Sequence, residues 1–178
     1  DITFPDRLQV TADLGEALAG AELVVVAVPS HGIRDVLRRA ASEVQSGAIV
    51  VSAAKGLEQG SLYRPSEIIG QELGDDVRVG VVSGPSFAME MARELPTAVC
   101  IASVDEGVVE RVQIDFRSSH FRLYGSSDVV GVEIGGALKN VIAIAAGVAE
   151  GLGLGHNAQA GLITRGLAEM VRLGVAMG

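Results

Sequence analysis

The stretch Leu23-Val-Val-Val-Ala-Val28, closed by Pro29-Ser30, decides the fold class. A continuous run of mainly β-branched residues that ends at a turn signal predicts a strand buried on both faces of a sheet. A helix is expected directly after it, because Ser30 is a suitable N-cap and apolar residues follow at helical spacing as far as Gly47. These apolar residues are Ile33, Val36, Leu37, Ala40 and Val44.

The same strand and helix unit recurs along the chain. Further strands are expected at 48–54, 77–83, 97–102 and 121–124, and further helices at 65–73, 86–95 and 105–116. Such alternation predicts a parallel, doubly wound sheet with right-handed crossovers. After Asp128 the pattern changes to two long Ala- and Gly-rich helices, at 129–151 and 157–174. We therefore predict an α/β fold: a partial Rossmann-like domain in 1–128, then the start of an all-helical domain in 129–178.

The composition of the chain argues against binding to nucleic acid or to a membrane. The chain has 178 residues, 48% of them hydrophobic, and a net charge of −8. It can bury a core, and it offers no basic surface to nucleic acid or to an anionic membrane. We expect no membrane span, no secretory leader and a cytoplasmic protein that acts on a small molecule. The single cysteine, Cys100, lies in an apolar run and is interpreted as a core residue in a reducing compartment.

Lys139 is the first candidate catalytic residue. Between Glu133 and Glu150 the only polar side chains are Lys139 and Asn140, which predicts a helix buried on nearly every face. In one interpretation desolvation lowers the pKa of Lys139, so that its amine acts as a general base. In the other, the lysine reaches the surface or pairs with a carboxylate. The glycines at 135 and 136 favour the first interpretation, because they let a ligand or backbone approach closely.

Two further candidates follow predicted strands. Lys55 stands at the carboxyl end of one strand, where doubly wound sheets bind ligands, although a lysine beside Gly56 is also typical of a surface turn. In Ser83-Gly84-Pro85-Ser86 a strand runs into a helix, with Gly84 or Ser86 as the cap and Pro85 at the first helical position. The free amides of that turn could bind a phosphate, or the segment is an ordinary capped turn.

Other motifs are assigned structural roles or left open. Gly153-Leu-Gly155-His-Asn-Ala158 matches a dinucleotide-binding fingerprint, but it follows a helix and is interpreted as an interhelical turn. No metal site is expected, because His31, His120 and His156 lack metal-ligand spacing. Arg165 either pairs with Glu169 along its helix or binds anionic groups near Lys139.

Five motifs together resemble one enzyme family. They are Ala27-Val-Pro-Ser30, Ala54-Lys-Gly-Leu-Glu58, Ser83-Gly-Pro-Ser-Phe-Ala88, Gly135-Gly-Ala-Leu-Lys-Asn140 and Leu162-Ile-Thr-Arg-Gly-Leu167. In this order they resemble bacterial NAD(P)-dependent glycerol-3-phosphate dehydrogenase, and the match spans essentially the whole chain. The resemblance implies interconversion of sn-glycerol 3-phosphate and dihydroxyacetone phosphate for phospholipid synthesis, with NAD or NADP as cofactor.

The resemblance also implies roles for single residues. Lys139 would accept the proton of the C2 hydroxyl as hydride leaves C2. The implied substrate-binding residues are Lys55, Gly84, Ser86 and Asn140, and the implied cofactor-binding residues are Lys55, Ala88 and Pro29.

The chain departs from the family at both ends, which look like cuts through something longer. The family's amino-terminal strand and G-x-G-x-x-G turn are expected ahead of Asp1, and an Asp and a Ser-Arg-Asn motif beyond Gly178. A non-catalytic fragment or binding module is therefore one alternative. A β-hydroxyacid or ketopantoate-type reductase is another, although the motif at 83–88 argues against it. The choice between NAD and NADP stays open, as does the oligomeric state, for which a homodimer is one alternative.

Overall fold

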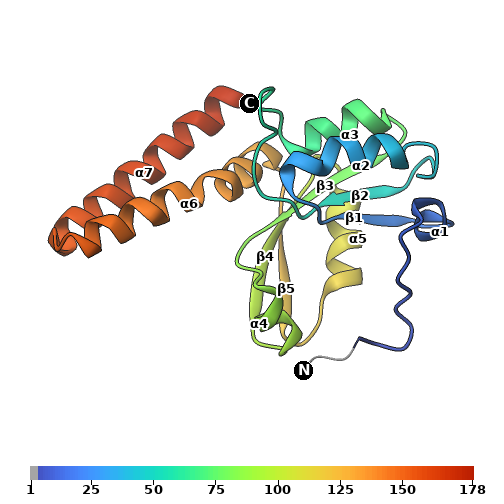
Figure 1. The fold of residues 1–178 in the computed structure, drawn as a ribbon, viewed down its shortest axis with the longest axis horizontal. Coiled ribbons are helices and arrows are strands. Elements are labelled where there is room, and N and C mark those ends of the chain that lie inside the picture. The colour runs from blue at the N-terminus through green and yellow to red at the C-terminus, as the bar shows by residue number, and fades with distance from the viewer. Residues whose placement is uncertain (1–3) are drawn as a thin grey trace.

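The computed structural model describes residues 4–178, which form a five-stranded sheet with helices on both faces and a long helical hairpin (Figure 1). The strands lie in sequence order: β1 (Leu23–Val26), β2 (Ile49–Ser52), β3 (Arg78–Ser83), β4 (Thr97–Ala102) and β5 (Phe121–Ser126). The other elements are α1 (Leu14–Leu18), the 3-10 turn η1 (Ser30–Gly32), α2 (Ile33–Ala40), α3 (Pro65–Leu73), α4 (Ala88–Ala92), α5 (Glu106–Phe116), α6 (Val129–Gly151) and α7 (Gly155–Met177).

The hydrophobic core lies on both faces of β2, because helices cover the sheet on both sides. Val50 packs with residues of α2 and α3 on one face, whereas Ile49 and Val51 pack with Val108 and Val112 of α5 on the other. All four residues of β2 are buried. The predicted Rossmann-like α/β class is therefore confirmed.

One strand pairing differs from the prediction of an all-parallel sheet. β1, β2 and β3 are parallel, and so are β4 and β5, but β3 and β4 are antiparallel. The physical reason lies in α4, which has five residues, none of them buried. A parallel return needs a crossover element that packs along the sheet. Because α4 does not, the chain reverses direction and β4 returns beside β3.

Two predicted helix starts are also wrong. Ser30 lies in the η1 turn, and α2 begins after Gly32 without a side-chain cap. The helix expected from residue 86 begins only at Ala88, so Gly84 and Ser86 are not its caps and Pro85 is not its first residue. The short helix α1 was not predicted at all, since its five residues are too few to show a periodic pattern.

Helices α6 and α7 extend side by side away from the sheet (Figure 1). Gly153, in the turn between them, and Gly155, the first residue of α7, take φ angles of +67° and +81°, which confirms the interhelical turn. The expectation that α6 is buried on nearly every face is wrong, because Val141, Ile144 and Val148 are 63%, 68% and 55% exposed. By length and composition alone α6 could cross a membrane, so the expected absence of a span stays a prediction.

A buried carboxylate joins the helical hairpin to the sheet layers. Glu133, in the second turn of α6, is 5% exposed. Its carboxylate oxygens accept hydrogen bonds from Arg64 Nη1 (2.8 Å), the Ser66 amide (2.8 Å) and Ser66 Oγ (2.6 Å). Since Arg64 and Ser66 lie at the start of α3, this cluster attaches α6 to the layer that covers the sheet.

We predict that Glu133→Ala lowers the free energy of unfolding by about 3 kcal/mol, because it removes the buried carboxylate and leaves the Arg64 guanidinium, 12% exposed, with Glu67 as its remaining ion partner. Urea denaturation followed by circular dichroism measures this loss. The matched control is Glu150→Ala, which removes an exposed carboxylate from the same helix and should change stability by less than about 0.5 kcal/mol. Equal effects of the two substitutions would contradict the proposed attachment.

Candidate active site

A cavity of about 450 Å³ lies where the ends of β2 and β3 meet the first turns of α6. Lys55 reaches it from the loop after β2, residues 83–87 from the end of β3 and the turn that follows, and Cys100 from β4. Helix α6 contributes Gly131, Val132, Gly135, Gly136 and Lys139. The cavity therefore joins segments that are more than 80 residues apart in the sequence.

Both lysines of the chain line this one cavity, although the net charge of the chain is −8. Lys55 Nζ donates to the Gly84 carbonyl oxygen at 3.0 Å and to Ser86 Oγ at 3.2 Å. Burial and the positive charge of Lys139 lower the pKa of Lys55. Two lysines and a serine that line one cavity can bind a small anion such as a phosphate ester.

Lys139 lies at the cavity, but its surroundings differ from the prediction. Its side chain is exposed, and Nζ donates to Asn140 Oδ1 at 2.7 Å. The predicted desolvation is wrong, because α6 packs on the sheet by its first turns only and Lys139 lies beyond them. Asn140 is exposed too, and it does not line the cavity.

Two glycines permit the close packing that forms the cavity. Gly84 has a φ of +146°, and a Cβ there would lie 2.9 Å from the Val99 Cα atom. A Cβ on Gly136 would lie 2.6 Å from Ser83 Oγ. The close approach predicted one turn before Lys139 is thus confirmed at Gly136, and its neighbour is the end of β3. Gly135 has no such neighbour and opens onto the cavity.

A second, mostly apolar cavity of about 680 Å³ adjoins the first and shares Lys55 and Ser86 with it. Its remaining walls come from the sheet, α4 and α5: Val25, Val51, Ala53, Val82, Ala88, Met91, Ala92, Phe116, Phe121 and Leu123. Ala88, predicted to face a cofactor, lies here. Pro29 is exposed and lines neither cavity, so its predicted cofactor contact stays a prediction.

The remaining sequence candidates have local roles. Cys100 is only half-buried and lines the first cavity, so its interpretation as a core residue is wrong. Burial and the charge of Asp128 raise the pKa of its thiol. Arg165 Nη2 pairs with Glu169 at 3.1 Å along α7, as the simpler interpretation had it. Within residues 4–178 no three His, Cys, Asp or Glu side chains gather as metal ligands would.

Sequence reasoning missed two carboxylates that support the site. Glu133 was noted only as the border of an apolar run, although a lone acid in the first turns of such a helix is a signal for a buried ion pair. Glu58 was quoted in a motif without a role. Its partner, Arg34, lies 24 residues earlier in the sequence, and no spacing rule connects the two.

Substitution at Gly84 tests the close contact in the cavity wall. We predict that Gly84→Ala destabilises the fold by about 2 kcal/mol more than Gly47→Ala. Both glycines have positive φ, but a Cβ at Gly47 meets nothing within 4 Å, so the pair of variants separates collision from backbone strain. Thermal unfolding of both variants measures the difference. Similar melting temperatures would show that the backbone of Val99 yields to the added methyl group.

Comparison with known proteins agrees with this arrangement. Residues 1–109 match the model of the NAD-dependent glycerol-3-phosphate dehydrogenase N-terminus, and residues 128–178 match that of its C-terminus. A glycerol-3-phosphate dehydrogenase [NAD(P)+] of Syntrophotalea carbinolica is 51% identical over 99% of this chain and 54% of its own length. One of Thermoanaerobacter sp. is 48% identical over 100% of this chain and 53% of its own length. The chain thus spans about half the length of the curated relatives it matches.

Solved structures give the same answer. The crystal structure of glycerol-3-phosphate dehydrogenase from Coxiella burnetii superposes with a TM-score of 0.91 at 39% identity, covering 100% of this chain and 54% of that one. The Plasmodium falciparum enzyme superposes with a TM-score of 0.86 at 28% identity, covering 92% and 46%. The conclusion from sequence, fold and cavity is that the chain belongs to the NAD-dependent glycerol-3-phosphate dehydrogenase family.

Proposed function

We propose that this chain supplies the catalytic centre of an NAD(P)-dependent glycerol-3-phosphate dehydrogenase, which interconverts sn-glycerol 3-phosphate and dihydroxyacetone phosphate for phospholipid synthesis. The observation that carries the proposal is the meeting of both lysines of an acidic chain at one cavity, beside Ser86 and Gly84. The names and identities of its relatives support the same reaction.

In this proposal Lys55 and Ser86 bind the substrate and Lys139 transfers the proton. In oxidation, Lys139 Nζ acts as the neutral amine: it takes the proton of the C2 hydroxyl and becomes an ammonium while hydride leaves C2. In reduction, the ammonium returns that proton to the carbonyl oxygen. The exposure of Lys139 suits this role, because a lysine in contact with water can exchange its proton after each turnover. Gly84 and Asn140 complete the proposed substrate contacts.

The second cavity is where we propose that the nicotinamide lies. Its mostly apolar walls suit a flat ring, and it shares Lys55 and Ser86 with the first cavity, which would bring ring and substrate together. NAD or NADP supplies the hydride acceptor and donor when bound. Ala88 would face the ring and Pro29 the rest of the cofactor. We also propose that 1–128 and 129–178 are separate domains, and that the enzyme is a cytoplasmic homodimer.

The test is an assay of this 178-residue chain, with its intact mass verified, in which absorbance follows NADH and NADPH in turn with dihydroxyacetone phosphate. Turnover supports the proposal for the chain itself. No turnover, together with activity in a longer chain, would mean that the residues of this chain need the rest of the enzyme. Inactivity of both would favour the non-catalytic binding module instead.

For Lys139 we predict that Lys139→Ala lowers kcat in the full-length enzyme by about 10²–10⁴-fold, because it removes the proton-transferring group. The dissociation constant of the cofactor, measured by fluorescence titration, should stay within about twofold. Arg165→Ala, which removes an exposed charge from α7, is the control and should leave kcat unchanged. A fully active Lys139→Ala variant would overturn the assignment.

A further inference from the structure

We infer that Glu58, held by Arg34, is a positioning residue that directs the Lys55 ammonium into the cavity. The inference rests on the proposed function, because that function makes Lys55 a substrate-binding residue. Glu58 itself lines neither cavity, so its effect must pass through the loop between β2 and α3.

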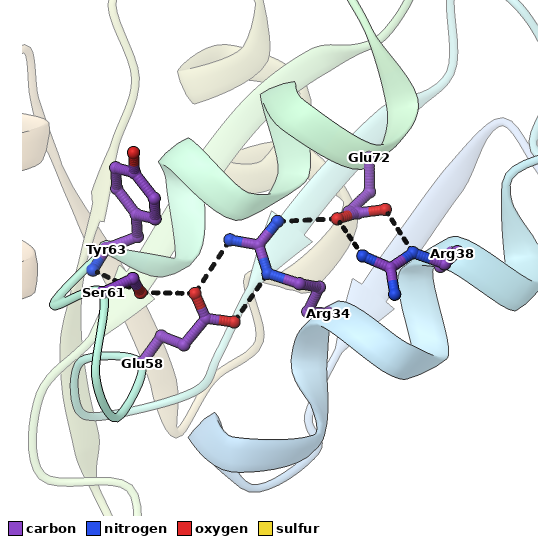
Figure 2. Close-up of polar contacts among 6 residues, drawn as sticks. All are labelled: Arg34, Arg38, Glu58, Ser61, Tyr63 and Glu72. Atoms are coloured by element: carbon purple, nitrogen blue, oxygen red, sulfur yellow. Dashed lines mark hydrogen bonds and ion pairs between the residues drawn. The ribbon is translucent and has the colours of Figure 1, made fainter.

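Arg34 and Glu58 make a bidentate contact, in which two nitrogen atoms of the guanidinium donate to the two oxygen atoms of the carboxylate. Arg34 Nε donates to Glu58 Oε1 at 2.7 Å, and Arg34 Nη2 donates to Glu58 Oε2 at 2.8 Å (Figure 2). A guanidinium that donates to both oxygens of a carboxylate fixes the orientation of the carboxylate as well as the distance between the two groups. The side chains are 21% and 17% exposed, so water competes little for these bonds. Glu58 is thereby fixed to helix α2.

Arg34 is itself fixed from two other directions. Its Nη1 donates to Glu72 Oε1 of α3 at 2.6 Å, and its guanidinium lies 5.8 Å from the centre of the Tyr63 ring. Glu72 is held in turn by Arg38, whose Nη2 lies 3.0 Å from Oε1 (Figure 2). The anchor of Glu58 is therefore a network across two helices and not a single flexible arginine.

The loop closes on Glu58, so fixing this residue fixes the loop. The Glu58 amide donates to the Tyr63 carbonyl oxygen at 2.9 Å, and the Leu62 amide donates to the Glu58 carbonyl oxygen at 2.9 Å. The Ser61 hydroxyl donates to the Glu58 carboxylate (Figure 2). Main chain and side chain of Glu58 thus hold the far end of the loop together.

Little freedom remains between Glu58 and Lys55. Only Gly56 and Leu57 separate them, and Gly56 has a φ of +123°. A Cβ at Gly56 would lie 3.1 Å from Ser30 Oγ, so the main chain beside Lys55 packs against the η1 turn. With one neighbour packed and the third residue anchored, the main chain is restrained on the carboxyl-terminal side of Lys55.

Charge balance favours a positioning role over a direct electrostatic one. The network joins two arginines to two carboxylates, so its formal charge is zero. The hydrogen bonds from Arg34 and Ser61 lower the pKa of Glu58 to about 2, which keeps the pair ionised at neutral pH. A neutral cluster changes the potential at the cavity little, and its main effect on Lys55 is geometric.

The experiment uses the chain labelled with ¹³C at the ε-carbon of lysine. Two lysines give two signals, which Lys55→Arg and Lys139→Arg assign. In phosphate-free buffer we expect Glu58→Gln to raise the titration midpoint of Lys55 toward that of a free lysine, and to leave the Lys139 signal unchanged. Inorganic phosphate, added as the probe, should bind about tenfold more weakly, which is the contribution of one charge-assisted contact.

Two further variants keep the inference falsifiable. Glu72→Gln is the matched control: it also removes a carboxylate partner of Arg34, but it leaves the paired contact with Glu58 in place, so it should change the Lys55 signal and the phosphate affinity much less than Glu58→Gln does. Arg34→Lys should reproduce the effect of Glu58→Gln, because an ammonium cannot form the paired contact. It gives the answer should Glu58→Gln fail to fold.

The outcomes separate this inference from the proposed function. An unmoved Lys55 signal in a folded Glu58→Gln or Arg34→Lys variant would overturn the positioning role, even if the free energy of unfolding fell. A shift of the Lys55 titration midpoint in Glu72→Gln as large as that in Glu58→Gln would also overturn the positioning role, because it would show that loss of any carboxylate partner of Arg34 loosens the loop. A wild-type chain that shows the expected lysine signals but binds no phosphate would contradict the proposed substrate site and leave the positioning result standing.

Discussion

The buried contact between Glu133, Arg64 and Ser66 is the constraint on which the site depends. Glu133 lies in α6, six residues before Lys139, or about 9 Å along the helix axis. Arg64 ends the loop between β2 and α3, which carries Lys55. One carboxylate therefore joins the two segments that carry the lysines. Because an unpaired charge at this depth costs several kcal/mol, the segments cannot separate without a large loss of stability.

This attachment explains how an acidic chain can present two ammonium groups to one cavity. Like charges repel, and the repulsion contributes to the lowered pKa of Lys55. Other contacts have to hold the two lysines near each other. The ion pair of Glu133 with Arg64 fixes α6, which carries Lys139, and the ion pair of Arg34 with Glu58 fixes the loop that carries Lys55. Because the net charge is −8, the chain as a whole does not attract an anion from a distance. Electrostatic interactions across water are in any case screened beyond about 8 Å at physiological salt. The anion binding proposed here therefore rests on contacts inside the cavity.

The sequence predicted the elements of the fold better than their connections. The bounds of α3, β4 and α6 agree with the prediction residue for residue, because the spacing of apolar residues is a local signal that does not depend on what an element contacts. The direction of β4 could not be predicted in this way. It depends on whether α4 packs along the sheet, and a helix of five residues, none of them buried, carries no signal for that. The predicted N-caps were wrong for a similar reason. Ser30 and Ser86 are suitable residues, but Ser30 begins the η1 turn, and Phe87 in an extended conformation separates Ser86 from α4.

Lys139 shows how a residue can be found through an argument that is only half right. The apolar composition of α6 predicted that the lysine is buried, yet composition states what a helix can bury and not what it contacts. The glycine pair was the sounder signal. Gly136 allows α6 to approach Ser83 at the end of β3, and Glu133, three residues earlier on the same face of the helix, holds it there. Lys139 continues that face by three residues, so the contact that brings α6 to the sheet also brings its lysine to the cavity.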